Sequence, residues 1–230
     1  MTANQILARL KKLSNPKNVA GMARYGINPE NAYGVPLPAL RAIAKEVGKD
    51  HELAAELWKS GVHEARIIAP LIEEPSRVTA KQADRWVRDF DSWDICDQCC
   101  NNLFRKTGFA HDKAAEWCAR DEEFVRRAGF ALIASLAVHD KTAPDSRFTP
   151  HLAAVRRAAT DERKYVKKAV NWALRQIGKR NRALNKRAAA AAEEISALDS
   201  KAARWIAADA LKELRSDAVQ ERLLQRAAKR

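Results

Sequence analysis

The chain has 230 residues, of which 47% are hydrophobic but only 7% aromatic, with eight glycines and eight prolines. This composition argues against a turn-rich β protein and predicts an all-α fold, and no run approaches the ~18 apolar residues of a membrane-spanning helix. The 42 Lys and Arg residues against 29 Asp and Glu give a net charge of +13, which favours a polyanionic partner such as nucleic acid over a basic protein without special affinity.

The first fifty residues are expected to be irregular. A short amphipathic helix is predicted over 2–12, and Asn15-Pro16 then either ends it or begins a second helix that continues to Tyr25. Prolines and glycines crowd the stretch 26–38 and predict a loop, after which a helix is expected over 39–47.

From residue 51 onward the sequence predicts consecutive helix pairs. The expected pairs are 51–60 with 63–73, 79–90 with 92–105, 112–119 with 122–138, 148–159 with 162–178, and 183–196 with 200–214. The second helices resemble one another and recur about every 30–45 residues, which is the spacing of HEAT or armadillo repeats. We therefore predict one all-α domain over 1–230, a curved α-solenoid of HEAT-like helix pairs with its repeats in 51–230. A compact helical bundle fits the recurring pattern less well.

Aspartates stand before three of the second helices. They are Asp121, Asp161 and Asp199. A side-chain oxygen at this position typically accepts a hydrogen bond from the first turn of the helix. We therefore expect these three residues to act as N-caps.

A short stretch near the middle of the chain places an indole and a carboxylate on one helix face. If a helix begins at Asp91 or Ser92, Trp93 and Asp97 lie one turn apart on the same side, with Asp94 one residue off that line. Such a pair can bind a cation or stabilise a developing positive charge. The alternative is an N-capped helix with a core tryptophan and a solvated aspartate.

Four cysteines, Cys96, Cys99, Cys100 and Cys118, are expected to be thiols in a reducing cytoplasm, because the sequence shows no export signal. Three of them share one helix face within a few residues, which does not suit a tetrahedral metal site, and no paired spacing supplies a fourth ligand. We therefore expect small buried side chains and no bound metal.

Matched positions of the second helices come together if these helices line one surface. The groove would then gather Trp93, Asp97, Arg126, Arg127, Lys167, Lys168 and Trp172. Taken alone, Trp172 is better explained as a core residue and Arg127 as a surface charge. Their conjunction with a carboxylate in a basic groove favours a functional site.

At these residues the sequence resembles the HEAT-like-repeat DNA glycosylases of the bacterial DNA alkylation repair enzyme family, which remove alkylated purines. The resemblance covers most of the chain, and the blocks match in order and approximate spacing. They are Asn15-Pro16, Met22-Ala23-Arg24-Tyr25, Gly34-Val35 with Pro38 and Arg41, Ser92-Trp93-Asp94 with Asp97, Val125-Arg126-Arg127-Ala128, and Lys168-Ala169 with Trp172-Ala173-Leu174-Arg175. The loop 139–150 is longer than the family pattern.

The resemblance implies roles for particular residues. Asp97 stands at the family's catalytic carboxylate position, Trp93 and Trp172 match two indoles that cradle the deoxyribose of the lesion, and Arg127 matches an arginine that contacts the DNA backbone. Tyr25 lies in the motif whose tyrosine is near the damaged nucleotide. The other residues expected to contact DNA are Arg126, Lys164, Tyr165, Lys167 and Lys168, and some family members carry two aromatic residues where this chain has Lys164 and Tyr165.

The expected function is that of a monofunctional DNA glycosylase without metal or cofactor. It would act on cationic alkylpurines of the 3-methyladenine and 7-methylguanine type in duplex DNA, without base flipping, with Asp97 stabilising the positive charge on the sugar and orienting water. We expect a monomer in the bacterial cytoplasm, associated with the nucleoid when bound to DNA and not with a membrane. The alternatives are a non-catalytic HEAT-repeat module that binds nucleic acid and a protein-binding HEAT scaffold.

Overall fold

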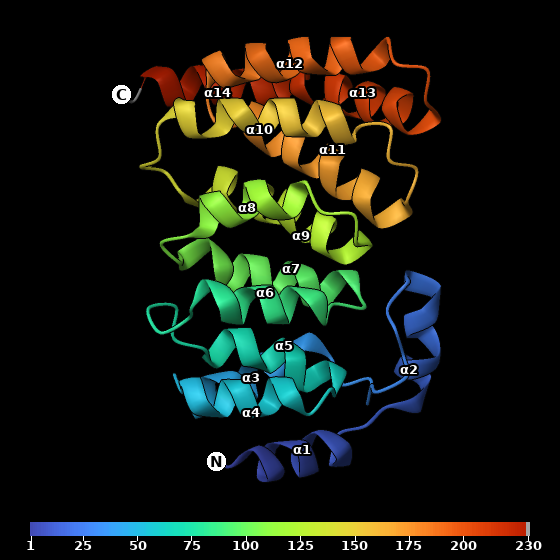
Figure 1. Cartoon of the computed structure of the whole chain (residues 1–230), viewed down its shortest axis with the longest axis vertical. Helices are drawn as coiled ribbons and strands as arrows, with labels where there is room; N and C mark the ends of the chain where they lie inside the picture. The colour runs from blue at the N-terminus through green and yellow to red at the C-terminus, as the bar shows by residue number, and fades with distance from the viewer. Residues whose placement is uncertain (229–230) are drawn as a thin grey trace. The chain divides into compact units, whose positions relative to one another are not determined.

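The computed structural model describes residues 1–228, and all regular secondary structure within them is helical. Fourteen α-helices and two short 3-10 helices follow one another along this part of the chain (Figure 1). The chain divides into two compact units, Met1–Thr107 and Gly108–Arg230. The prediction of an all-α fold is therefore confirmed, whereas the single domain over 1–230 stays a prediction.

The first unit contains seven α-helices and both 3-10 helices. Its elements are α1 (Ala3–Lys12), α2 (Pro16–Met22), η1 (Ala23–Tyr25), α3 (Leu37–Val47), α4 (His51–Lys59), α5 (His63–Ile72), α6 (Ala80–Arg88), α7 (Trp93–Asn102) and η2 (Phe104–Lys106). The predicted helices of this unit are all present, with ends shifted by a few residues. Asn15 caps α2, because its side-chain oxygen accepts hydrogen bonds from the backbone nitrogens of Lys17 and Asn18.

Aromatic stacking fixes the outer helices of the first unit. The rings of Trp58 in α4 and Trp86 in α6 stack with centroids 4.1 Å apart, and the indole nitrogen of Trp58 donates to Asp89 over 2.8 Å. Behind this pair, α5 packs against α3, α4 and α7. The packing holds the first turns of α5 and α7 side by side, and residues of both turns line one cavity.

The second unit consists of the remaining α-helices. They are α8 (Ala110–Cys118), α9 (Glu123–His139), α10 (Asp145–Ala158), α11 (Lys164–Gly178), α12 (Arg182–Ser196), α13 (Lys201–Leu214) and α14 (Asp217–Ala228). The prediction of a loop over 139–150 was wrong in its extent, because α10 begins at Asp145 and contains Pro150. Helix α11 packs against both α9 and α13, so consecutive second helices are neighbours, as the repeat pattern predicts. A Cβ at Gly129 of α9 would lie 2.4 Å from the Cys118 backbone nitrogen, which explains why only glycine permits this approach of α8.

The three aspartates expected as N-caps do not cap their helices. The N-cap residues of α9, α11 and α13 are Glu122, Arg163 and Ser200, and of these only Ser200 caps with its side chain. Each aspartate instead forms an ion pair with an arginine. Asp121 and Asp161 bind Arg126, and Asp199 binds Arg204. With arginines this close, ion pairing replaces capping.

The four cysteines are buried thiols, as predicted. Burial raises the pKa values of the Cys99 and Cys100 thiols well above their usual range. Among residues 1–228, no three His, Cys, Asp or Glu side chains are arranged to hold a metal ion. Within the same residues, no helix combines the length and apolar character needed to cross a bilayer.

Candidate nucleic-acid interface

The first turns of α7 present an indole and a carboxylate to one cavity. Trp93 and Asp97 are both half-buried, and both line a cavity of about 350 Å³ in the first unit. Most of the remaining wall is apolar, with Met22, Ile27 and Leu40 among its residues. The one-turn spacing predicted from the sequence thus places both side chains on the same hollow.

Trp93 is held in place by η1 and the loop that follows it. Its indole nitrogen donates to the backbone oxygen of Tyr25 over 2.9 Å, while the Tyr25 side chain itself is exposed. The same loop is fixed to the start of α7 by Asn28, whose backbone nitrogen donates to Ser92 and whose side chain donates to Asp91, each over 2.9 Å. Ser92 is the N-cap residue of α7 but makes no capping bond, because its hydroxyl accepts from this loop instead.

His63, at the start of α5, is a member of the site that sequence reasoning missed. It is 5% exposed, and its Nε2 lies 2.9 Å from an oxygen of Asp94, which shares the cavity wall with Asp97. Burial alone would lower the pKa of His63. The hydrogen bond to Asp94, together with the charges of Asp94, Glu64 and Asp91, outweighs burial and raises the pKa above its usual value.

Glu64 is the second residue that sequence reasoning missed, and it organises the loop before α3. Its buried carboxylate accepts hydrogen bonds from the backbone nitrogens of Tyr33, Gly34 and Val35, at distances from 2.6 to 3.2 Å. A carboxylate in a concavity of backbone N–H groups is a strong, charge-assisted arrangement. Glu64 therefore anchors the loop that forms one wall of the cavity.

Gly34 explains why two separate sequence blocks belong together. Its φ is +72°, and a Cβ there would lie 2.5 Å from the backbone oxygen of Asn15. The side chain of Asn18 donates to the Gly34 oxygen over 2.8 Å, and the Asn15 nitrogen donates to the Tyr33 oxygen over 2.7 Å. The Asn15-Pro16 and Gly34-Val35 blocks thus form one contact that closes the cavity from the side of α2.

In the second unit, Arg127 lies in α9 and is 5% exposed. One of its guanidinium nitrogens donates to the backbone oxygen of Tyr165 over 2.8 Å, so the side chain spans from α9 to the first turn of α11. An arginine that contacts a DNA backbone needs donors that reach the surface. The structure gives Arg127 a firm position between two helices, and its contact with DNA stays a prediction.

Trp172 lies in the middle of α11 and is half-buried. Its indole nitrogen is 3.2 Å from the Gln176 side-chain oxygen in the amide orientation that also accepts from Lys179. Trp172 therefore occupies neither a fully buried core position nor a free surface position.

The predicted lysines and tyrosine of α11 lie at its exposed N-terminal end. Tyr165 stacks on Phe124 of α9 with centroids 5.6 Å apart, and the Lys164 ammonium lies 5.4 Å from the Tyr165 ring centroid. Lys168 is exposed and Lys167 is half-buried. Positive charge interleaved with aromatic rings is a typical surface for nucleic acid.

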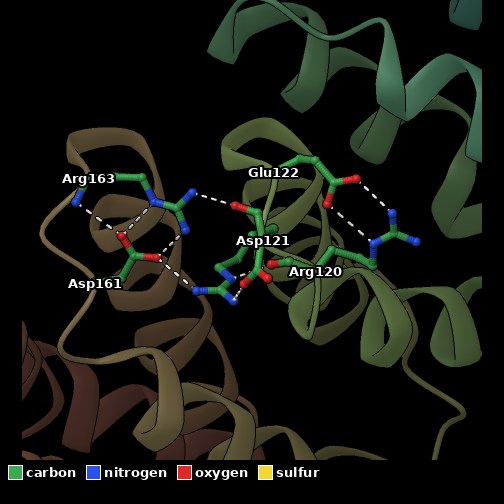
Figure 2. Close-up of polar contacts among 6 residues, drawn as sticks. Arg120, Asp121, Glu122, Asp161 and Arg163 are labelled. Carbon is green, nitrogen blue, oxygen red and sulfur yellow. Dashed lines mark hydrogen bonds and ion pairs between the residues drawn. The ribbon is translucent and has the colours of Figure 1, made fainter.

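Arg126, expected to contact DNA, belongs to an ion-pair network between two loops of the second unit. It donates to Asp161 over 3.1 Å, to Asp121 over 2.9 Å and to the Arg120 backbone oxygen over 2.5 Å. Figure 2 shows Arg163 reaching from Asp161 to the main chain of Asp121. Burial by itself raises the pKa of Asp161, but the hydrogen bonds from Arg163 and Arg126 lower it below its usual value.

The predicted site residues thus fall into two groups. Tyr25, Trp93 and Asp97 meet in the first unit, where Tyr25 contributes its backbone oxygen and leaves its ring exposed. The second group lies in the second unit and consists of Arg126, Arg127, Lys164, Tyr165, Lys167, Lys168 and Trp172. Within the second group, the contacts described above connect Arg127 and Lys164 to Tyr165.

Comparison with known proteins identifies the family. The model of a family described as "DNA alkylation repair enzyme" matches residues 6–226. A solved structure described as "a new family of proteins related to the HEAT-like repeat DNA glycosylases with affinity for branched DNA structures" has a TM-score of 0.81 at 21% identity, with 97% of this chain and 96% of that chain covered. This similarity confirms the predicted HEAT-like fold.

A curated relative matches part of the chain. An uncharacterized protein of Listeria innocua serovar 6a is 24% identical over 136 residues, which are 57% of this chain. The chain spans 61% of the length of that relative. On the match over nearly its whole length, the chain belongs to the DNA alkylation repair enzyme family.

Proposed function

We propose that this protein is a DNA glycosylase that hydrolyses the N-glycosidic bond of cationic alkylated purines in duplex DNA. The observation that carries the proposal is the cavity at the start of α7, where Trp93 and Asp97 stand one helical turn apart in a member of a DNA alkylation repair family. An indole face and a carboxylate are the groups that stabilise a growing positive charge by cation–π attraction and by direct electrostatics.

The reaction needs little from the protein beyond this charge stabilisation. A purine alkylated at N3 or N7 is already cationic, so the bond between C1′ and the ring nitrogen breaks with both electrons passing to the base, which leaves neutral. The positive charge moves to the sugar as an oxocarbenium ion. Water then adds to C1′ and releases a proton, which gives an abasic site. Asp97 stabilises the oxocarbenium ion and orients that water.

The remaining predicted residues would bind the DNA. Lys164, Lys167 and Lys168 at the start of α11 supply cations for phosphate contacts, and Trp172 on the same helix supplies a second indole for the sugar. The His63–Asp94 pair beside Asp97 positions the cavity wall and contacts no reacting atom in this proposal. Damaged sites would be selected mainly by the lability of the damaged bond, because this mechanism requires no base flipping.

A second candidate is a non-catalytic module that binds DNA of unusual structure. The observation that favours it is the similar fold of a protein described as having affinity for branched DNA structures. Asp97 and the two tryptophans would then be part of a binding surface without a chemical step. Base release separates the two candidates.

The test is single-turnover release of 7-methylguanine from a duplex oligonucleotide by wild type and Asp97→Asn. Removing one preorganised electrostatic contact raises a barrier by about 2–4 kcal/mol, so release should slow by about 30-fold to 1,000-fold while DNA affinity is kept. The matched control is Asp91→Asn. Asp91 is exposed just before the same helix, and the amide oxygen of the new asparagine can still accept the hydrogen bond from Asn28.

Each outcome decides between the candidates. Rapid release by wild type and by Asp91→Asn, with slow release by Asp97→Asn, supports the glycosylase. Equal release by wild type and Asp97→Asn removes Asp97 from the mechanism. Absence of release, repeated on the more labile 3-methyladenine lesion, with DNA binding intact, favours the non-catalytic module.

A further inference from the structure

Trp205 in α13 is exposed, unlike the other tryptophans of the chain. Its relative exposure is 41%, whereas Trp58, Trp86 and Trp117 are buried in the core. A single exposed apolar side chain is ordinary, so exposure alone carries no function. The residues around this indole suggest a binding role.

Two lysines lie beside Trp205. The Lys167 ammonium lies 5.8 Å from the ring centroid, and Lys201 stands one turn before Trp205 on the same helix. Within residues 1–228, the Lys201 side chain forms no hydrogen bond or ion pair, although the charge of Glu162 acts on it. The two nearby carboxylates have other partners: Glu162 accepts from Ser200 and Ala202, and Asp209 accepts from Asn171 and pairs with Arg175.

The same combination occurs one helix earlier. Tyr165 stacks on Phe124, and Lys164 lies over the Tyr165 ring. The two ring-and-lysine groups are joined by α11, which supplies Tyr165 to one and Lys167 to the other. We call the surface formed by Phe124, Lys164, Tyr165, Lys167 and Trp205 the α9–α13 platform.

Polar contacts between α11 and α13 hold this platform rigid. Glu162, just before α11, accepts from the Ala202 nitrogen over 2.9 Å and so fixes the first turn of α13. Further along, Asn171 donates to Asp209 over 2.6 Å and Arg175 donates to Glu213 over 2.8 Å. The helix that carries Trp205 is therefore fixed before binding, which lowers the ordering cost of binding.

We propose that the α9–α13 platform binds a single-stranded DNA segment, in which an unpaired base stacks on the exposed face of Trp205 while Lys167 of the platform and the neighbouring Lys201 contact the flanking phosphates. An indole face next to cations binds unpaired bases of any sequence, whereas bases inside an intact duplex are already stacked and expose only their edges. This inference rests on the proposed binding of DNA and adds a second class of DNA structure to it.

The experiment compares DNA affinities for wild type, Trp205→Ala and Trp205→Phe. The probes are an intact duplex and a duplex of the same length that carries a single-stranded dT arm, at one fixed salt concentration. Wild type should prefer the DNA with the arm. Trp205→Ala should weaken binding to it by about fivefold to 100-fold, the loss of one base–aromatic stack, and change duplex affinity by less than about twofold.

Two controls separate stacking from folding. Trp205→Phe keeps a ring and should restore most of the preference, and Leu224→Ala alters another exposed apolar residue, 52% exposed, outside the platform. Stacking should also quench indole emission when the dT arm binds, and the quenching should be largely lost in Trp205→Phe.

The outcomes distinguish this inference from the proposed function. Equal affinity for both DNAs, or an equal loss on both in Trp205→Ala, overturns the platform while leaving duplex binding and base release intact. Absence of binding to either DNA by wild type rejects both proposals. Base release from an alkylated duplex by Trp205→Ala should match wild type, because the platform is not part of the chemical step.

Discussion

His63 is a buried histidine whose protonation the surrounding carboxylates favour. The pKa of His63 is raised in the folded state, so its protonated form stabilises the folded protein. This stabilisation is complete below the pKa of the unfolded state, about 6.5, and is lost as the pH rises through the pKa of the folded state. We expect the free energy of unfolding of wild type to fall as the pH rises above about 6.5, relative to that of His63→Gln.

Urea unfolding of the two proteins across this range measures the effect. At pH below 6 the variant should be less stable by about 2 kcal/mol, the typical value of a charge-assisted hydrogen bond, and the difference should shrink at higher pH. A difference that stays constant with pH would show that His63 acts by packing alone. Because wild type and variant share every other histidine, the difference isolates His63.

Site residues that lie close together in the sequence could be predicted, whereas site residues whose partners lie far away in the sequence could not. Trp93 and Asp97 belong to one helix turn, so their spacing alone places them on one face. His63 and Glu64 stand at an unremarkable helix start, and their roles depend on Asp94, 31 residues away, and on backbone groups of the loop before α3, about 30 residues earlier. No pattern within α5 reveals such partners.

At the level of the elements, the contacts of the connecting loops were the part of the fold that the sequence did not predict. The loop between η1 and α3 has its own anchor in Glu64 and packs on α2 through Gly34. Sequence composition predicted that this stretch is a loop, but not that it is buried against a helix on one side. In the same way, the sequence shows an aspartate before three of the second helices and so predicted caps. These aspartates form ion pairs with Arg126 and Arg204 instead, and such pairs depend on side-chain geometry that the sequence pattern does not show.

Gly34→Ala tests whether the loop contact holds the cavity wall. The new Cβ would meet the Asn15 oxygen and would also occupy a positive φ, so we expect a loss of about 2–4 kcal/mol in the free energy of unfolding. Gly61→Ala is the matched control, since Gly61 has a φ of +70° with nothing within 4 Å of its Cβ position, and should cost only about 1–2 kcal/mol. Equal losses in urea unfolding would mean that the contact with Asn15 adds nothing.

At the scale of the whole molecule, repetition made the fold predictable. The recurring second helices gave the helix pairs and the HEAT-like fold before any contact was known, because each pair buries its apolar face only against its neighbours. Helix α14 was not among the predicted pairs. The assembly of a site from several repeats depends on the placement of one repeat against another, which sequence spacing alone does not define.

Net charge and local charge make different contributions to DNA affinity, and salt dependence separates them. The chain carries a net charge of +13, but only residues that touch phosphates release counterions. If Lys164, Lys167 and Lys168 each contact one phosphate, replacing all three by Gln should reduce the slope of log affinity against log salt concentration by about 3. The measurement is duplex affinity from about 50 to about 200 mM salt.

A charge-matched variant is the control for this experiment. Replacing Lys11, Lys12 and Lys45 by Gln removes the same number of charges from exposed positions in the first unit. Its slope should stay close to that of wild type, because long-range attraction changes the affinity without changing the number of phosphate contacts. If both variants lower the slope equally, DNA is held by the overall charge, and the start of α11 is not a specific contact surface.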